Sequence, residues 1–318
     1  MNRRPTESMA MQEYRFDGRV AVVTGAGRGI GRAYAHLLGD LGAKVVVNDL
    51  GGTIEGSGSD ATPAQIVAQE IIDAGGVAVA DVSDISTVAG GKHAIDTALE
   101  NFGRIDIVVN NAGNVRFGGL PDVDADNIEN HLAVHVMGAF NTSHAAWPHM
   151  IEQNYGRIVI TSSIGMFGLP DNTGYATAKA AVLGMANSMT LSAGEHDIKI
   201  NVIAPNAMTR MGGAPSDGMA QIRHKTDEPK SDMDPSLVAP MVGYLAHEVC
   251  NVSGETYLAG AGRFAHLFSG VTEGYLHPDP HNAGIADVVD NLSQIKDRTG
   301  YYTPDSLMDC VKHYMAHR

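Results

Sequence analysis

The sequence predicts an α/β fold, a doubly wound parallel sheet of seven strands with a helical extension at its C-terminal side. Short β-branched segments alternate with longer helical patterns along most of the chain, which is typical of a parallel sheet covered on both faces. A glycine-rich turn follows the first of these segments. With 318 residues, of which 44% are hydrophobic, the chain is long enough for one large α/β domain or two small ones.

Composition narrows the classes of partner. The formal net charge of −14 argues against nucleic acid and against anionic membranes, because both repel an acidic surface. No stretch of 18 uninterrupted apolar residues predicts a membrane span. The 14 histidines are scattered without HExxH or Cys/His ligand spacing, so we expect no metal site.

The expected compartment is the cytoplasm. Two cysteines, Cys250 and Cys310, are too few for a disulfide framework and fit a reducing environment. The basic residues near the start are not followed by an apolar run, and the last residues, AHR, match no SKL-type peroxisomal signal.

The first strand is expected at residues 19–24 (RVAVVT), after a flexible polar arm at residues 1–14. It enters a glycine turn, GAGRGIG at residues 25–31, and a helical pattern that closes at Gly42. Glycines let the backbone come close to a pyrophosphate, and the helix N-terminus offers free N–H groups. In this strand–turn–helix context the turn indicates a dinucleotide site of the Rossmann type.

The second strand, residues 44–48, ends at Asp49, 18 residues after Gly31. A carboxylate at this point is placed to hold the ribose hydroxyls and would repel a 2′-phosphate, which favours NAD over NADP. Arg28 favours NADP, since it could contact the 2′-phosphate. Asp49 is given more weight because it lies directly at the ribose position. The alternative is that Asp49 is only a turn residue ahead of Gly51 and Gly52.

The next elements continue the alternation. After a glycine- and serine-rich loop we expect a helix at 62–74, a strand at 77–81, a helix at 84–101 and a strand at 104–110. Asp81 and Val82, at the end of the third strand, are placed to contact the adenine edge. The fourth strand leads into Asn111, Ala112 and Gly113, where structural stabilisation is the preferred role for Asn111.

The second half completes the sheet. We expect a long helix at about 124–153, a strand at 155–162, a helix from about 173 to 195, a strand at 198–203, a helix near 235–248 and a strand near 255–259. Residues 207–233 have the composition of a lid over a substrate. The main domain is therefore expected at 15–262, and a C-terminal helical extension at 263–318, with helices at 285–297 and 304–316.

The chemistry is concentrated in residues 161–181 (TSSIGMFGLPDNTGYATAKAA). Tyr175 and Lys179 are spaced i, i+4, so on a helix they share one face. An ammonium beside a phenol lowers the pKa of the phenol and makes it a general acid or base near neutral pH. An ordinary surface pair on a helix is the alternative.

Five ordered motifs together resemble the short-chain dehydrogenase/reductase family. They are Thr24-Gly25-x3-Gly29-Ile30-Gly31, Asn110-Asn111-Ala112-Gly113, Ser162, Tyr175-x3-Lys179 and Asn201-x-Ile203-x-Pro205. The resemblance covers about residues 15–262 and implies one doubly wound domain, with the cofactor across the strand ends and the substrate above the nicotinamide. It also implies a homodimer or homotetramer.

The resemblance assigns roles to matching positions. Tyr175 becomes the acid/base, Lys179 lowers its pKa and holds the ribose, and Ser162 orients the carbonyl or alcohol. Ser163 is also eligible, but twelve residues separate Ser162 from Tyr175 and the glycines at 165 and 168 fall in the family register, which favours Ser162.

Two positions depart from the family pattern. His135 stands where the family has an asparagine that supports a water-linked proton path, so His135 joins Ser162, Tyr175 and Lys179 as a catalytic candidate. Asn206 replaces the usual glycine after Pro205, and we assign the threonine that contacts the carboxamide in the family to Thr209. The residues expected to bind the cofactor are Gly25, Arg28, Gly29, Ile30, Gly31, Asp49, Asp81, Val82, Asn111, Ala112, Gly113, Tyr175, Lys179, Pro205 and Thr209.

Several segments, among them VVVNDLGG (45–52) and AAWPHM (145–150), are similar to the (3R)-hydroxyacyl-CoA dehydrogenase branch of the family. The resemblance implies NAD-dependent interconversion of a secondary alcohol and a ketone, on a 3-hydroxyacyl-CoA. The alternative within enzymes is a dehydrogenase for 17β-hydroxysteroids or other bulky alicyclic alcohols. The alternative from another class is a nucleotide-binding scaffold or redox sensor without turnover.

The expected lid does not separate these substrates. Its methionines suit an adaptable apolar pocket for either an acyl chain or a sterol, and its basic residues could meet the phosphates of CoA or simply face solvent. The methionines are Met208, Met211 and Met219, and the basic residues are Arg210, Arg223, Lys225 and Lys230.

Overall fold

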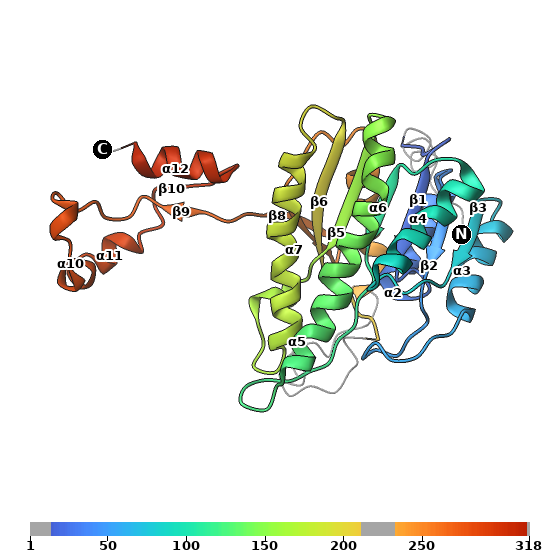
Figure 1. Ribbon diagram of the computed structural model, residues 1–318, viewed down its shortest axis with the longest axis horizontal. Coiled ribbons are helices and arrows are strands. Elements are labelled where there is room, and N and C mark those ends of the chain that lie inside the picture. The colour runs from blue at the N-terminus through green and yellow to red at the C-terminus, as the bar shows by residue number, and fades with distance from the viewer. Residues whose placement is uncertain (1–13, 211–232, 317–318) are drawn as a thin grey trace. The chain divides into compact units, whose positions relative to one another are not determined.

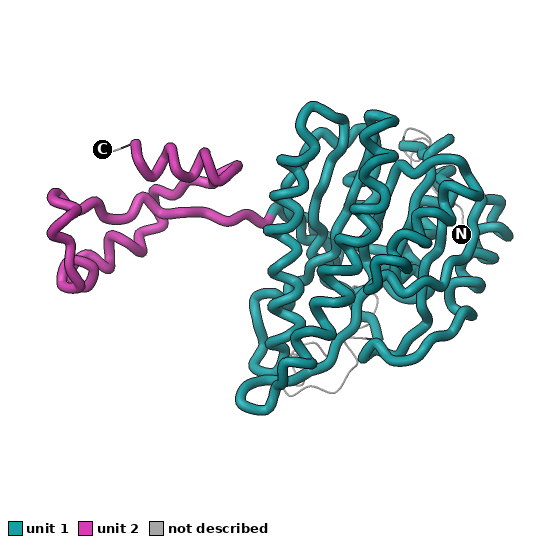
Figure 2. The backbone as a smooth tube through the Cα atoms, in the orientation of Figure 1, with its two compact units in different colours: residues 1–266 teal, residues 267–318 magenta. Residues whose placement is uncertain are grey.

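The computed structural model describes residues 14–210 and 233–316. The chain divides into two compact units, residues 1–266 and 267–318 (Figure 2). The division falls four residues after the boundary expected at residue 262. Most of the predicted N-terminal arm (residues 1–13) and of the predicted lid (residues 211–232) lies outside the described residues.

Unit 1 is built on an eight-stranded sheet with the order β3-β2-β1-β4-β5-β6-β7-β8. Its strands are β1 (Val20–Thr24), β2 (Lys44–Asn48), β3 (Val77–Asp81), β4 (Ile107–Asn110), β5 (Gly156–Thr161), β6 (Ile198–Pro205), β7 (Thr256–Gly260) and β8 (Arg263–Leu267). The pairs from β3 through β7 are parallel. The doubly wound α/β fold predicted from the sequence is confirmed.

The sheet has one strand more than the seven predicted. Only Ala261 and Gly262 separate β8 from β7, and both have positive φ values, 51° and 73°. Two such residues are typical of a tight hairpin turn. The sequence gives little sign of β8 because four of its five residues are exposed.

Helices cover both faces of the sheet (Figure 1). α2 (Gly29–Asp40), α3 (Thr62–Asp73) and α9 (Ala239–Ala246) contribute to one apolar cluster, and α4 (Val88–Phe102), α6 (Gly138–Glu152) and α7 (Thr173–Ser192) to the other. β1 supplies both clusters, because successive side chains of a strand point to opposite faces. Ala21 and Val23 lie in the first cluster, and Val20 and Val22 in the second.

The strand register places the functional loops together. Val23 pairs with Val109, Asn110 with Ile160, and Thr161 with Ile203, so the carboxyl ends of β1, β4, β5 and β6 lie at one edge. The strand order reverses between β1 and β4, which is the topological switch point where ligands bind in open α/β sheets.

The predicted helix at 124–153 consists of three consecutive segments. α5 (Ala125–His131) leads into a π-helix, η1 (Leu132–Met137), and then into α6. A π-helical turn inserts an extra residue per turn and is frequent at functional sites. His131 ends α5 and His135 lies within the π-helical turn.

Unit 2 contains a two-stranded antiparallel sheet and short helices. Its elements are β9 (Val271–Thr272), η6 (Pro280–Asn282), α10 (Ile285–Asp290), α11 (Leu292–Ile295), β10 (Tyr301–Tyr302) and α12 (Leu307–Met315). The helices predicted at 285–297 and 304–316 correspond to α10 with α11 and to α12. None of the described residues of this unit, 267–316, is buried.

Among the described residues, no helix combines the length and the apolar character needed to cross a bilayer.

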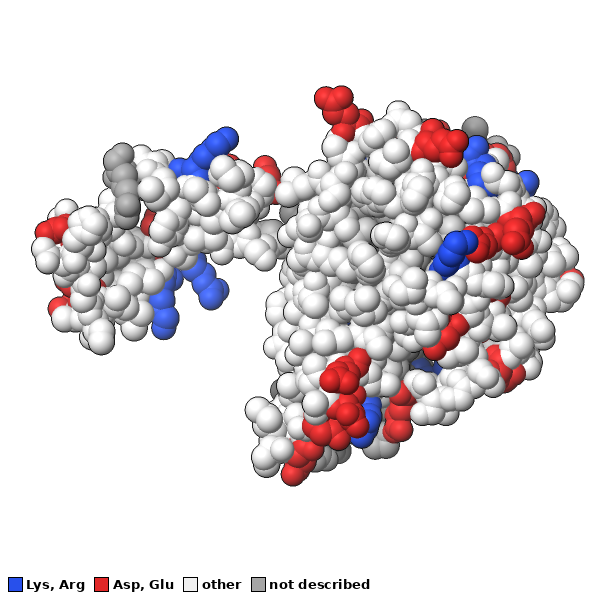
Figure 3. Space-filling model, in the orientation of Figure 1, with Lys and Arg blue, Asp and Glu red and all other residues white. Residues whose placement is uncertain are grey.

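On the face of unit 1 shown in Figure 3, uncharged residues predominate and acidic side chains form several small groups with few basic ones between them.

Candidate active site

The glycine turn after β1 is shaped for a close backbone approach. Gly25 and Gly29 have φ values of +63° and +55°, and a Cβ added to Gly31 would overlap the carbonyl oxygen of Gly25. α2 begins here without a side-chain cap, so its first N–H groups are not satisfied by a capping side chain. Arg28 and Ile30 lie in the same turn. This cradle fits the pyrophosphate of a dinucleotide.

Asp49 holds the glycine turn. Its Oδ2 accepts a hydrogen bond from Gly27 N at 2.8 Å, and its Oδ1 accepts one from Gly51 N at 2.7 Å. The structural role that the sequence left as an alternative is therefore present. Each oxygen keeps a further lone pair, so binding of the ribose hydroxyls stays a prediction.

Asp81 lies in a polar network at the end of β3. It accepts hydrogen bonds from Asn48 Nδ2 at 2.6 Å and Ser83 Oγ at 2.8 Å, and its Oδ1 lies 3.0 Å from His93 Nδ1. The next residue, Val82, has an exposed side chain. The network fixes this strand end, and the predicted adenine contact stays a prediction.

Asn111 stabilises the strand ends, as preferred from the sequence. Its Nδ2 donates to Thr24 O at 3.0 Å and to Gly25 O at 3.1 Å. The amides of Asn111 and Ala112 both donate to Thr24 Oγ1 at 3.0 Å. The loop after β4 is thus attached to the start of the glycine turn, and Gly113 follows directly.

The segment after β6 reaches the same turn. β6 ends at Pro205, and Thr209 Cγ2 lies 3.5 Å from the position of a Cβ added to Gly29. The pKa of Arg210 is lowered, first by burial and then by the charge of Arg28. Arg28 was assigned to the cofactor from the sequence, and Arg210 only to the expected lid.

Lys179 is anchored beneath the site. It is 3% exposed, and its Nζ donates to Thr161 O, at the end of β5, at 2.8 Å. The same Nζ lies 5.6 Å from the centroid of the Tyr175 ring. The single helix face predicted for Tyr175 and Lys179 is confirmed, since both lie on α7 and close to the end of β5.

The two serines after β5 have different partners. The hydroxyl of Ser162 donates to Lys179 O at 2.6 Å and is 1% exposed. The hydroxyl of Ser163 accepts from Gly165 N at 3.0 Å and lies near enough to Tyr175 to lower the pKa of that phenol in part. A Cβ added to Gly165 would lie 2.8 Å from Tyr175 Cε1 and 3.3 Å from Ser163 Oγ, so these two groups converge on one point.

The assignment of Ser162 as the catalytic serine stays a prediction, and Ser163, which lies beside the Tyr175 ring, is the alternative. Successive side chains point in opposite directions where a strand ends, so a shift of one position exchanges the two serines. The 3₁₀ helix η2 (Ile164–Phe167) begins directly afterwards, with Ser163 as its N-cap.

Burial controls the ionisation of the pair. Burial raises the pKa of Tyr175, and the hydrogen bond with Ser163 lowers it in part. Burial also lowers the pKa of Lys179 to about 7. The predicted lowering of the Tyr175 pKa by Lys179 is not found, because loss of solvent penalises the phenolate and the ammonium alike.

His135 is held in its neutral form. It is 4% exposed, its Nε2 lies 2.8 Å from Asn114 O, and burial, followed by the charge of Lys179, lowers its pKa well below the usual range. Its Nδ1 is buried without a hydrogen-bond partner in the described part of the chain. A role in a proton path stays a prediction.

His131 also belongs to the site. The rings of His131 and His135 are stacked, with centroids 6.0 Å apart, and both meet the Tyr175 ring edge-on, at 6.1 Å and 5.4 Å. Both histidines are expected on one helix from the sequence, but only His135 is expected to have a role. Their i, i+4 spacing was the available signal.

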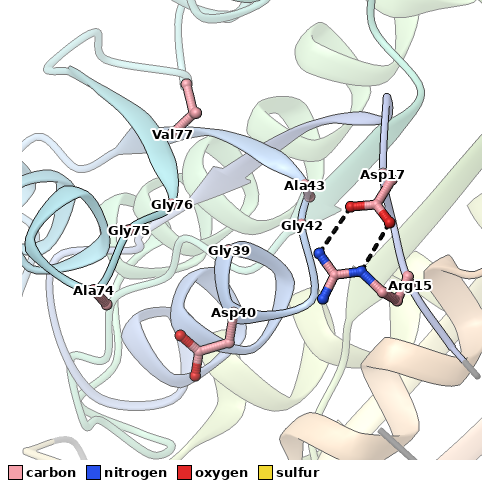
Figure 4. A pocket seen from close by; sticks show the side chains of 10 residues that line it. All are labelled: Arg15, Asp17, Gly39, Asp40, Gly42, Ala43, Ala74, Gly75, Gly76 and Val77. Atoms are coloured by element: carbon pink, nitrogen blue, oxygen red, sulfur yellow. Dashed lines mark hydrogen bonds and ion pairs between the residues drawn. The ribbon is translucent and has the colours of Figure 1, made fainter. Parts of the chain in front are cut away.

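A hollow of about 470 Å³ lies at the opposite edge of the sheet (Figure 4). It is lined by the Arg15–Asp17 ion pair, by the end of α2 and by residues 74–77, next to the amino ends of β2 and β3. It is separate from the site described above.

The described residues contain no group of three or more His, Cys, Asp or Glu side chains that could hold a metal ion.

A glycine turn at the switch point of a doubly wound sheet, beside a half-buried tyrosine and a buried lysine, is typical of Rossmann-type oxidoreductases. The family model described as short chain dehydrogenase matches residues 19–216, and the chain belongs to this family.

The most similar relatives include multifunctional enzymes. The chain is 43% identical over 249 residues to peroxisomal multifunctional enzyme type 2 of Drosophila melanogaster, covering 78% of this chain and 40% of that protein. The solved structure of the full-length fly enzyme matches with a TM-score of 0.76 and 31% identity, over 95% of this chain and 50% of that one. The chain thus spans well under two thirds of the length of this relative.

Two further similarities bear on function. A short-chain type dehydrogenase/reductase of Mycobacterium tuberculosis is 38% identical over 283 residues, covering 89% of this chain and 95% of that protein. A 7α-hydroxysteroid dehydrogenase solved with NADH and 7-oxo glycochenodeoxycholic acid matches with a TM-score of 0.70 and 28% identity, over 80% of this chain and 96% of that one. These similarities agree with the family assignment, since both proteins are named dehydrogenases.

Proposed function

We propose that this chain is an NAD-dependent dehydrogenase that interconverts a 3-hydroxyacyl-CoA and the corresponding 3-ketoacyl-CoA. The observation that carries the proposal is the half-buried Tyr175 phenol, beside Ser163 and one helical turn from Lys179, at the sheet edge that carries the glycine turn. The acyl-CoA substrate is supported by the similarity to multifunctional enzymes named hydratase-dehydrogenase-epimerase.

The cofactor is proposed to lie across the carboxyl ends of β1, β4 and β6. The glycine turn would hold the pyrophosphate, Asp49 the ribose, Asp81 and Val82 the adenine, and Pro205 and Thr209 the nicotinamide. Asp49 favours NAD over NADP, because its carboxylate would repel a 2′-phosphate. When bound, NAD supplies the acceptor for a hydride, or NADH its donor.

The chain itself handles the proton. Since burial raises the pKa of Tyr175, its phenol is protonated at neutral pH and is ready to donate to a ketone oxygen. In the oxidative direction only the ionised form of Tyr175 can take the hydroxyl proton, and the raised pKa makes that form scarce at neutral pH. Ser163 donates a hydrogen bond to the same substrate oxygen, and Lys179, whose pKa lies at about 7, exchanges a proton near neutral pH.

A steroid or another bulky alicyclic alcohol is the second candidate substrate. The solved 7α-hydroxysteroid dehydrogenase supports it, since that protein holds a bile-acid derivative on a similar fold. A non-catalytic scaffold or redox sensor is disfavoured by the intact Tyr175–Lys179 pair.

We further propose a homodimer or homotetramer. The cytoplasmic location stays a prediction, since several relatives are named peroxisomal.

Absorbance at 340 nm tests the proposal directly. The protein is mixed with NAD or NADP and with a 3-hydroxyacyl-CoA or a 17β-hydroxysteroid. We expect NADH to form with the thioester. Tyr175→Phe should lose most of kcat and still bind NADH by fluorescence titration. Turnover of the steroid alone would favour a hydroxysteroid dehydrogenase. Absence of turnover with every alcohol would favour a non-catalytic nucleotide-binding scaffold.

A further inference from the structure

His131 adopts one tautomer, fixed by two backbone groups. The ring is fully buried, its Nδ1 lies 2.7 Å from Asn127 O, and its Nε2 accepts a hydrogen bond from Arg116 N at 3.1 Å. A backbone N–H can only donate and a carbonyl can only accept, so Nδ1 carries the proton and Nε2 does not. Burial lowers the pKa of His131, and the charges of Lys179 and Arg116 lower it further, which keeps the ring neutral.

The segment held by His131 joins the cofactor side of the site to the catalytic helix. Arg116 is held by two side chains of α5. Its N–H donates to His131 Nε2, and its carbonyl accepts from Asn127 Nδ2 at 2.9 Å. Two residues further on, Gly118 N donates to Asp171 O at 2.7 Å, just before α7 begins. The segment 114–118 therefore runs from the loop after β4 to the start of α7.

His131 also contacts that start of α7. A Cβ added to Gly174 would lie 2.7 Å from His131 Nδ1 and would overlap Asn127 Oδ1, so only a glycine allows this approach. The next residue is Tyr175, whose ring meets His131 edge-on at 80°. One imidazole thus contacts the backbone of segment 114–118, the backbone of α7 and the ring of the proposed acid/base.

We propose that His131 is a positioning residue for the reaction, whose neutral ring fixes segment 114–118 and Tyr175 relative to each other. The proposal rests on the proposed function, because alignment of Tyr175 matters only where that phenol transfers a proton. Misplacement of a reacting group by about 1 Å can cost on the order of 100-fold in rate. The role does not require His131 to touch the substrate or to change its charge.

The chain offers a matched control in His247. This histidine is 5% exposed, its Nε2 lies 3.0 Å from Arg15 O, and its Nδ1 accepts from Val249 N at 3.2 Å. Like His131, it is held by one backbone carbonyl and one backbone N–H, although the two ring nitrogens exchange these roles. It lies near the amino end of β5, where its carbonyl accepts from Arg157, and not at the edge that carries Tyr175.

The test compares three variants of the full chain. His131→Phe keeps a ring but loses both hydrogen bonds, and we expect kcat to fall roughly 10- to 100-fold while NADH affinity stays unchanged. His131→Gln can still accept from Arg116 N and should recover most of kcat. His247→Phe should lose stability without a change in kcat. A fall in kcat for His131→Phe no larger than that for His247→Phe would overturn the proposal.

Amide exchange of Arg116 supplies a readout that needs no substrate. Exchange should be faster in His131→Phe and close to wild type in His131→Gln and His247→Phe. Unchanged exchange in His131→Phe would overturn the proposal whether or not any alcohol is oxidised. If the phenylalanine variant does not fold, His131→Asn replaces it, since its shorter side chain reaches Asn127 O but not Arg116 N.

Discussion

Ser162 and Ser163 are neighbours in the chain, yet their hydroxyls have different partners. Ser162 donates to the backbone of Lys179, whereas Ser163 accepts from Gly165 N and lies beside Tyr175. The first bond anchors α7 to the end of β5. The proposed function therefore gives Ser162 a structural role and Ser163 a role in the reaction.

Replacing each serine by alanine should affect kcat in one variant and the free energy of unfolding in the other. Ser163→Ala should lower kcat by about 100-fold, because a donor to the substrate oxygen is lost. Ser162→Ala should lower the free energy of unfolding by about 1–2 kcal/mol, since the buried carbonyl of Lys179 loses its partner, with kcat near wild type. Steady-state kinetics and urea unfolding of both variants check this. The reverse pattern would restore Ser162 as the catalytic serine.

Lys179 should make stability depend on pH. Its pKa falls from 10.5 to about 7 on folding, so between these values the unfolded chain binds one more proton than the folded chain. The free energy of unfolding therefore rises with pH in this window, by up to ~1.4 kcal/mol per pH unit from this group. Lys179→Met should show a flatter rise than wild type from pH 7 to 10 in urea unfolding.

The control for this measurement is Lys92→Met, which removes an exposed lysine from a surface pair with Asp96. Its unfolding free energy should follow the wild-type pH dependence. Parallel curves for wild type and Lys179→Met would show that the buried amine is protonated in the folded protein.

At the scale of elements, the site depends on how closely α5, η1 and α7 approach. The π-helical turn follows directly after His131 and contains His135, and both rings meet Tyr175. Gly174 removes the Cβ that would otherwise separate α7 from α5. Helix patterns in the sequence predict that these elements exist, but not this distance between them.

Two glycines of α7 should respond in opposite ways to alanine. A Cβ at Gly184 meets nothing within 4 Å, so Gly184→Ala should raise the free energy of unfolding by about 0.5–1 kcal/mol through helix propensity. Gly174→Ala should lower it and reduce kcat, because the new methyl group collides with Asn127 and His131. Thermal unfolding and kinetics of the two variants check this. Equal effects would mean that α7 does not pack closely at Gly174.

At the scale of the whole molecule, stability is concentrated in unit 1. Two apolar clusters fill the faces of its sheet, whereas unit 2 contains no buried residue in the range 267–316. Ile285, Leu307 and Tyr314 are each at least 75% exposed. About 50 residues without a core cannot offset the conformational entropy that folding removes.

Residues 267–318 prepared alone should therefore not unfold cooperatively. Circular dichroism of this peptide should change gradually on heating, while the full chain shows a sharp transition from unit 1. A cooperative transition of the isolated peptide would show that it has an independent core.

Elements could be predicted from the sequence where a short run of neighbouring residues is enough to determine the backbone. β1 and β2 were found because buried parallel strands need continuous apolar runs, and the glycine turn because only glycine adopts its backbone. Ser163 was eligible but not preferred, and His131 had no assigned role, because the neighbours of a side chain depend on which way it points and on what a distant segment places beside it.

The sequence by itself determined the doubly wound architecture, the dinucleotide turn and the pairing of Tyr175 with Lys179, since each follows from spacing along one strand or helix. Only the tertiary structure decided the hydrogen-bond partners of the two serines, and it raised the pKa of Tyr175 where spacing alone predicted a lower one. The physical reason is burial, because desolvation depends on all the surrounding residues and not on the interval between two of them.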